Sequence, residues 1–204
     1  MRERQYAEKR ITKETVISVK LNIDGSGETK ISSKIGFMDH MLELFAFWGK
    51  FDLEITTEKA DTNVDIHHLN EDLGIVLGQG FKTALGDKAG INRNGFASFP
   101  MEDTTANVTV DLSGRASLKF NITPEVYSIE PQPNEGYEFK YAEHFFAAFA
   151  KQLGMNLNIR LENPNLDLHA SLEPVFKALG KALGEAAQID PRRKGVPSTK
   201  GILD

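Results

Sequence analysis

The pattern of residues 39–55, DHMLELFAFWGKFDLEI, is repeated in residues 143–159, EHFFAAFAKQLGMNLNI, and the fold prediction starts from this repeat. In register, His40 faces His144 at an offset of 104 residues. A second pair of segments, HHLNEDLGIVLG at 67–78 and HASLEPVFKALG at 169–180, matches at an offset of 102. Because the register holds over two segments with only a two-residue difference, we infer an internal duplication.

Each copy of the repeat predicts the element order β-β-α-β-α. Alternating apolar residues indicate half-buried strands, and apolar residues every three to four positions indicate helices. The first copy predicts strands at 16–23, 28–34 and 51–57 and helices at 38–48 and about 65–86. The second predicts strands at 105–112, 116–122 and 155–161, helices at 141–153 and 172–187, and a Pro-rich loop over 124–139.

These elements predict an α+β fold of two pseudo-symmetric halves, with the helices packed on one face of each mainly antiparallel sheet. The first two strands of each copy are expected to pair as a hairpin. The predicted organisation is a first repeat at 1–90, a second repeat at 91–187 and a C-terminal tail at 188–204.

Composition excludes several classes of protein. Hydrophobic residues make up 40% and charged residues 26% of the 204 residues, which is typical of a folded globular chain. The absence of cysteine excludes disulfides and thiolate metal sites. The net charge of -5 argues against general nucleic-acid binding. No apolar run is long enough to predict a membrane-spanning helix. The charged start, MRERQYAEKR, lacks the apolar core of a signal peptide, so we expect a cytoplasmic protein.

All five histidines lie in matched elements of the repeat, which favours a metal site: His40, His67, His68, His144 and His169. His67 and Glu71 are four residues apart and share one helix face, whereas His68 points about 100° away and serves a different site. Imidazole and carboxylate ligands suit manganese, iron or zinc, with Asp65 and Asp72 available to orient the rings. The alternative interpretation is a helix start capped by Asp65 and followed by two solvated histidines.

Basic residues and the tail suggest phosphate binding, which requires forked or point-charge donors. The candidates are Arg93, Arg115, Lys177, Ser198 and Lys200. Taken singly, each also fits an exposed turn or a frayed terminus. Metal ligands drawn from two repeats or two subunits would lie at an interface, so we expect a homo-oligomer.

The sequence resembles one enzyme family over nearly its whole length. GFMDHMLELFA, HHLNEDLGIVLG, GDKAGINRNG, DLSGR, AEHFF, LEPVFKALGKAL, DPR and GVPSTKG occur in the order found in imidazoleglycerol-phosphate dehydratases. The resemblance implies a hydro-lyase of histidine biosynthesis that converts imidazole glycerol phosphate to imidazole acetol phosphate. It also implies a 24-subunit assembly with two Mn²⁺ ions per subunit, held between subunits.

The resemblance also implies roles for individual residues. The implied metal ligands are His40, His67, His68, Glu71, His144, His169 and Glu173. The implied phosphate contacts are Arg93, Arg115, Lys177, Ser198 and Lys200. Glu14 lines the site and is expected to move protons, so the catalytic set is Glu14, His67, Glu71 and Glu173.

Several positions depart from the family pattern. Ala170 replaces the second histidine of the second motif, so one metal site is expected to lack a ligand. Pro174 is expected to weaken the helical pairing of His169 with Glu173. A family histidine is replaced by Trp48, and two polar residues of the family around the first histidine pair are replaced by Ile66 and Leu69. Two alternatives therefore stay open: a homologue that binds metal or a phosphorylated ligand without dehydrating it, and a lyase or isomerase acting on another phosphorylated molecule.

Overall fold

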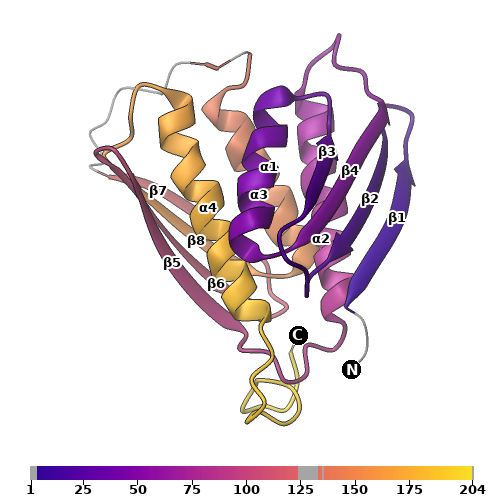
Figure 1. Ribbon diagram of the computed structural model, residues 1–204, viewed down its shortest axis with the longest axis vertical. Helices are drawn as coiled ribbons and strands as arrows, with labels where there is room; N and C mark the ends of the chain where they lie inside the picture. The colour runs from indigo at the N-terminus through magenta and orange to yellow at the C-terminus, as the bar shows by residue number, and fades with distance from the viewer. Residues whose placement is uncertain (1–3, 124–132, 135, 204) are drawn as a thin grey trace.

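The computed structural model describes residues 4–123, 133–134 and 136–203. Two four-stranded sheets form the outer layers of this part of the chain, and four helices lie between them (Figure 1). The first repeat contains β1 (Gln5–Ile11), β2 (Val16–Asn22), β3 (Thr29–Ser32), α1 (Gly36–Gly49), β4 (Asp52–Lys59) and α2 (His67–Leu85). The second contains β5 (Asn94–Met101), β6 (Thr104–Asp111), β7 (Ser117–Thr123), α3 (Phe139–Leu153), β8 (Asn156–Glu162) and α4 (Leu168–Ala187).

The duplicated α+β fold is confirmed, with one further strand at the start of each repeat. The sheet orders are β1-β2-β4-β3 and β5-β6-β8-β7, so the two halves share one topology. Neither β1 nor β5 was predicted from the sequence. In β1, QYAEKRI, every residue is at least partly exposed, so this edge strand has no buried face to produce an alternating pattern.

The predicted hairpins are wrong. β2 pairs antiparallel with β1 and with β4, and β3 lies on the far side of β4, pairing with it in parallel. The second sheet repeats this arrangement around β8. A sequence pattern gives strands and turns, but the choice of neighbour depends on which strand the helical crossover returns to. The predicted loop at 124–139 lies largely outside the described residues.

Glycines allow the helices of the two repeats to approach closely. A Cβ added to Gly180 of α4 would lie 2.1 Å from the Phe45 carbonyl oxygen of α1. At the matching contact, a Cβ on Gly78 of α2 would lie 2.8 Å from the Phe149 carbonyl oxygen of α3. Both distances are too short for any residue with a Cβ. The duplication therefore pairs α1 with α4 and α2 with α3, across the two repeats.

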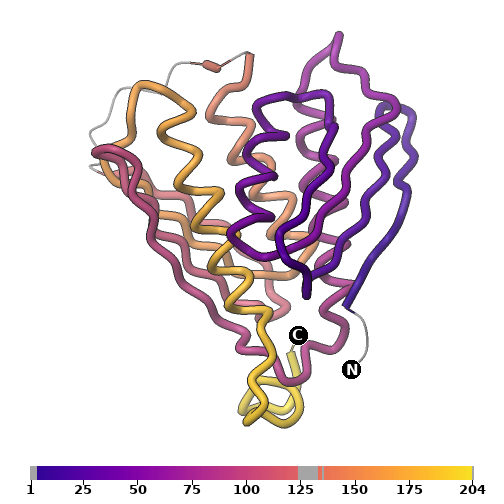
Figure 2. The backbone as a smooth tube through the Cα atoms, in the orientation of Figure 1, coloured from indigo at the N-terminus to yellow at the C-terminus, as the bar shows by residue number. Residues whose placement is uncertain are grey.

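The C-terminal tail folds back onto the loop between the repeats. The backbone N–H of Gly90 donates to the Gly195 carbonyl, and that of Asp190 donates to the Gly90 carbonyl, each at 2.9 Å. Figure 2 shows the tail and this loop together at one end of the molecule, close to the C-terminus. The tail is therefore anchored up to Gly195, and for this part the interpretation as a frayed terminus is wrong.

Candidate active site

The α1–α4 cluster consists of His40, His169 and Glu173. The Glu173 Oε2 atom lies 2.8 Å from His169 Nε2 and 3.5 Å from His40 Nε2. One ligand atom from each residue lies within 4.8 Å of the others, a spacing that suits coordination of a single metal ion. The expected weakening by Pro174 is wrong. Asp167 accepts a hydrogen bond from the His169 backbone, and α4 runs from Leu168 through Pro174.

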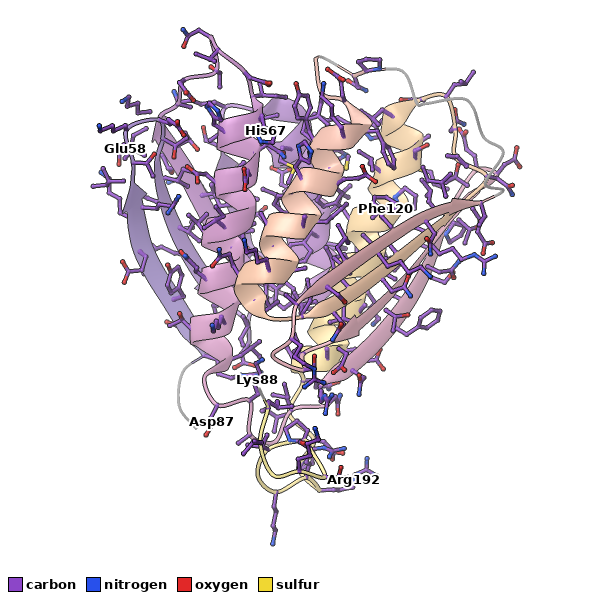
Figure 3. The ribbon with its side chains drawn as sticks, turned by 180° about the vertical axis from the view of Figure 1, so that it is seen from behind. Glu58, His67, Asp87, Lys88, Phe120 and Arg192 are labelled. Atoms are coloured by element: carbon purple, nitrogen blue, oxygen red, sulfur yellow. The ribbon has the colours of Figure 1, made fainter. Side chains whose placement is uncertain are left out.

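The α2–α3 cluster consists of His67, Glu71 and His144, which are the matched residues of the other helix pair. The Nδ1 atoms of His67 and His144 lie 2.9 Å apart, and His67 Nε2 lies 3.5 Å from Glu71 Oε2. His67 lies near the upper end of the molecule in Figure 3. Two donor sets of identical composition, two histidines and a glutamate, thus arise from one duplicated motif.

The Glu14 cluster consists of Glu14, Asp61 and His68. His68 Nδ1 lies 2.9 Å from Asp61 Oδ2 and 4.0 Å from Glu14 Oε2. The hydrogen bond with Asp61 raises the pKa of His68 above its usual value. His68 therefore points to a different group from His67, as the helical geometry predicted. Asp61 was missed by the sequence analysis, because nothing in the polar loop ADTNVD distinguishes it from its neighbours.

Asp65 and Asp72 do not orient the histidine rings by any hydrogen bond among the described residues. Asp65 accepts from the His67 backbone N–H at 3.0 Å and from the Tyr141 hydroxyl at 2.9 Å. Asp72 instead accepts from Arg10 and Thr15. Both carboxylates therefore hold backbone segments in place, one at the start of α2 and one between β1 and β2.

Among its described residues, the second repeat has no counterpart of the Glu14 cluster. Ala170 stands at the position that matches His68, and it is 5% exposed. Leu69 is fully buried in the core, and Ile66 packs against it. The apolar departures around the motif therefore serve packing, and Ala170 supplies no ligand atom.

Three of the phosphate candidates gather around the tail. Arg93 donates to both Asp111 carboxylate oxygens, at 2.6 and 3.0 Å, and to the Pro197 carbonyl at 3.0 Å. The hydrogen bond to Asp111 raises the pKa of Arg93 above its usual value, so the guanidinium stays charged. Arg93 thus lies beside the Ser198–Lys200 turn, in which the Ser198 hydroxyl accepts from the Lys200 backbone. Arg115 lies on the β6–β7 turn, an exposed position.

Lys177 lies apart from the tail and next to the α1–α4 cluster. Its ammonium forms an ion pair with Glu173, one helical turn away. Burial raises the pKa of Glu173, but hydrogen bonds from Lys177 and His169 outweigh it, and the net effect is a lowered pKa. Glu173 is therefore held as a carboxylate that can bind a cation.

Trp48 lies at the far end of α1 from His40, about 12 Å along the helix axis. Its ring packs edge-to-face on Phe99 with centroids 4.7 Å apart, and it lines a cavity of about 1270 Å³ with Lys181 and Phe96. Trp48 therefore does not contact the α1–α4 cluster.

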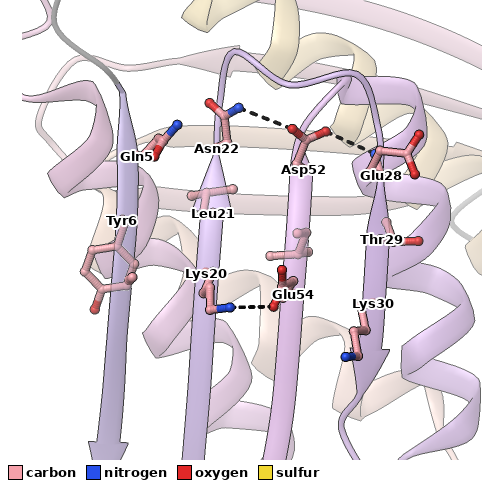
Figure 4. A pocket seen from close by; sticks show the side chains of 12 residues that line it. Gln5, Tyr6, Lys20, Leu21, Asn22, Glu28, Thr29, Lys30, Asp52 and Glu54 are labelled. Carbon is pink, nitrogen blue, oxygen red and sulfur yellow. Dashed lines mark hydrogen bonds and ion pairs between the residues drawn. The ribbon is translucent and has the colours of Figure 1, made fainter.

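A second hollow lies on the outer face of the first sheet (Figure 4). Lys20 pairs with Glu54 at 2.9 Å, and Asp52 accepts from Asn22 at 3.2 Å and from the Glu28 backbone at 3.1 Å. Lys20 and Glu54 are paired with each other, and the lining contains no histidine, so this hollow offers no comparable site.

The family model described as imidazoleglycerol-phosphate dehydratase matches residues 33–183. The chain belongs to the imidazoleglycerol-phosphate dehydratase family. The match covers α1, α2, α3, most of α4 and every histidine described above. No helix in residues 4–123, 133–134 and 136–203 has the length and apolar character to cross a membrane.

Individual members of the dehydratase family are similar over the full chain. The imidazoleglycerol-phosphate dehydratase of Pelobacter propionicus is 48% identical over 95% of this chain and 96% of its own. That of Maridesulfovibrio salexigens is 46% identical over the whole of both chains. The crystal structure of the Staphylococcus aureus dehydratase superposes with a TM-score of 0.78 at 31% identity, covering 91% of this chain and 99% of that one. The Pyrococcus furiosus enzyme gives a TM-score of 0.77 at 31% identity, covering 96% and 100%.

Proposed function

We propose that this chain removes water from imidazole glycerol phosphate and releases imidazole acetol phosphate, as a cytoplasmic hydro-lyase of histidine biosynthesis. The observation that carries the proposal is the α1–α4 cluster of His40, His169 and Glu173, whose ligand atoms are spaced for one metal ion, in a chain of this family. Loss of a hydroxyl from the carbon beside the imidazole and of a proton from the next carbon gives water and an enol, and the enol rearranges to the ketone.

The donor atoms fit a hard or borderline divalent ion, and we propose Mn²⁺. His40, His169 and Glu173 would hold one ion, and His67, Glu71 and His144 the other, with His68 adding a ligand to a neighbouring site. A bound ion supplies Lewis-acid stabilisation of negative charge on the imidazole ring of the substrate. Ala170 removes one ligand from the duplicated scheme, so we expect the two ions to bind with unequal affinity.

The remaining residues bind the substrate and move its protons. Glu14 carries a carboxylate 4.0 Å from His68 Nδ1, close enough to take a proton from a substrate carbon bound beside that histidine. Arg93, Arg115, Ser198 and Lys200 would bind the phosphate, and Lys177 would hold the side of the substrate next to Glu173. These donors carry positive charge or hydroxyl groups suited to a phosphate dianion.

We also propose that the active site is shared between chains of a homo-oligomer, with 24 subunits by family resemblance. The histidine clusters lie at the amino-terminal ends of the helices, whereas Arg93 and the tail lie beyond the carboxyl end of α4. Since α4 contains 20 residues, this separation is about 30 Å, too far for one small substrate to span.

Turnover with imidazole glycerol phosphate and Mn²⁺ tests the reaction. We expect metal-dependent formation of imidazole acetol phosphate that is lost in His67→Ala. If folded, metal-loaded protein forms no product, the dehydratase proposal fails. Ala170 favours one alternative, a family member that binds metal or a phosphorylated ligand without turnover, and a single tight ion per chain in an inactive protein would support it.

Complementation tests the shared site. His67→Ala and Lys200→Ala variants, each inactive alone, are co-expressed with different affinity tags and purified through both. We expect activity to return in the mixed assembly, because some sites then receive an intact histidine cluster from one chain and an intact tail from another. Mixed assemblies without activity would contradict the shared site.

A further inference from the structure

The turn between β1 and β2 carries Glu14, and its conformation is fixed by two threonines. The Thr12 hydroxyl oxygen accepts from the backbone N–H groups of Glu14, at 3.1 Å, and Thr15, at 2.9 Å. The Thr12 backbone N–H donates to the Thr15 carbonyl at 2.9 Å. These bonds close the turn on itself, but they do not place it relative to α2, where His68 lies.

Asp72 of α2 makes the link between this turn and the helix. Its Oδ2 accepts from the Thr15 hydroxyl, and its Oδ1 accepts from Arg10 Nε at 3.1 Å and NH2 at 2.8 Å. Asp72 is 7% exposed and Thr15 is fully buried. Charge-assisted hydrogen bonds in such a site are strong, because water does not compete for the carboxylate.

Asp72 and His68 are one helical turn apart on α2, and Glu14 is the residue before Thr15. Asp72 therefore holds β1, through Arg10, and the turn, through Thr15, against the part of α2 that presents His68. Next to this connection, Glu14 Oε2 lies 4.0 Å from His68 Nδ1.

The second repeat provides an internal comparison. The strand registers match Arg10 with Phe99 and Thr15 with Thr104, and the helix register matches Asp72 with Pro174. Thr104 donates to the Asn163 carbonyl instead of a carboxylate. The second repeat, which has Ala170 at the position of His68 and Asp103 at that of Glu14, lacks the Arg–Asp–Thr connection although it has the same fold. The fold itself therefore does not require the connection.

We infer that Asp72 is a positioning residue that acts through Thr15 to hold Glu14 at its working distance from His68. The inference rests on the proposed function only for the role of Glu14. Displacement of a proton-transfer group by about 1 Å is enough to slow a reaction by up to about a hundredfold. Asp72→Asn removes the charge and one of the two acceptor oxygens, and Thr15→Val removes the donor without changing the side-chain shape.

A double-mutant cycle with Glu14→Gln tests the inference. We expect Asp72→Asn and Thr15→Val to lower kcat about tenfold or more with little change in KM, and to have almost no further effect in the Glu14→Gln background. If the fold-losses in kcat of the single variants multiply in the double variants with Glu14→Gln, the inference is overturned, since Asp72 then acts independently of Glu14. Thr104→Val is the matched control, and we expect it to lower the melting temperature with kcat unchanged.

A spin label separates this inference from the proposed function. The chain has no cysteine, so Glu14→Cys gives a single labelling site in the full-length protein. We expect the nitroxide at position 14 to become more mobile when Thr15→Val or Asp72→Asn is added, and to be unchanged by Thr104→Val. Unchanged mobility with either variant overturns the inference even in an active enzyme. If the label becomes more mobile in a protein that shows no turnover, the role of Asp72 in holding the Glu14 turn stands, and only the proposed dehydratase activity is rejected.

Discussion

The His67 and His144 side chains face each other across α2 and α3 with their Nδ1 atoms 2.9 Å apart, just as His169 faces His40 across α4 and α1. Neither pair lies within one repeat. The helix that carries each HxxxE motif packs against the first helix of the other repeat. The duplication therefore creates two donor sets of the same composition only because the two halves exchange helix partners.

Metal content checks the independence of the two clusters. His144→Ala and His40→Ala each remove one ligand from a different cluster, so we expect each variant to lose one Mn²⁺ per chain. Metal analysis after gel filtration measures this. We also expect chelation to lower the melting temperature, because an ion present at a hundred times its Kd adds about 2.7 kcal/mol to the free energy of unfolding. Two variants that lose both ions would show a single coupled site.

The helix contact at Gly180 predicts a large loss of stability. In Gly180→Ala the new methyl group would meet the Phe45 carbonyl at 2.1 Å, so α1 and α4 must separate. We expect about 3 kcal/mol of destabilisation, measured by urea unfolding, and weakened metal binding at the α1–α4 cluster. Lys181→Ala, at the next and exposed position of α4, is the control and should change stability by less than about 0.5 kcal/mol. A Gly180→Ala protein as stable as its control would rule out the close contact.

The pKa of His68 depends on Asp61. Because their hydrogen bond raises the pKa of His68 in the folded protein, it stabilises the fold fully below the unfolded pKa of about 6.5, and this contribution is lost as pH rises through the folded pKa. We expect Asp61→Asn to lower the pKa of His68, measured by NMR titration of the metal-free protein. Asp103→Asn in the second repeat serves as control. An unchanged titration in Asp61→Asn would exclude the pairing.

The hydrogen-bonded carboxylate of Asp52, at the start of β4, is expected to make the fold sensitive to acid. Burial raises its pKa, but hydrogen bonds from the backbone of Ser26, Glu28 and Gly27 and from Asn22 outweigh it, and the net pKa is lowered. The stabilisation is present above the unfolded pKa of about 3.9 and is lost as pH falls through the folded pKa. We expect Asp52→Asn to cost about 1–2 kcal/mol at pH 7. Urea unfolding of both proteins measures the difference, which should shrink in acid, and a constant difference at all pH values would contradict this account.

Much of the site was predictable from the residues, because the two HxxxE spacings fix which side chains share a helix face. His67 with Glu71, and His169 with Glu173, follow from helical periodicity alone. Asp61 was not predictable, since an acidic residue in a polar loop carries no periodic signal. The separation of Lys177 from Arg93 likewise could not be predicted, because it depends on the length and direction of α4.

The duplication, the α+β class, most of the elements and the candidate ligands could all be predicted from the residues, since they follow from local periodicity and from a repeated register. Three features appear only in the folded chain: β3 pairs in parallel beyond β4, α1 packs on α4 and α2 on α3, and Asp72 contacts the Glu14 turn. Each of these depends on contacts between residues far apart in the chain, which no local pattern encodes. Close packing at Gly78 and Gly180 permits the two helix pairs, because a Cβ at either position would clash with the facing helix.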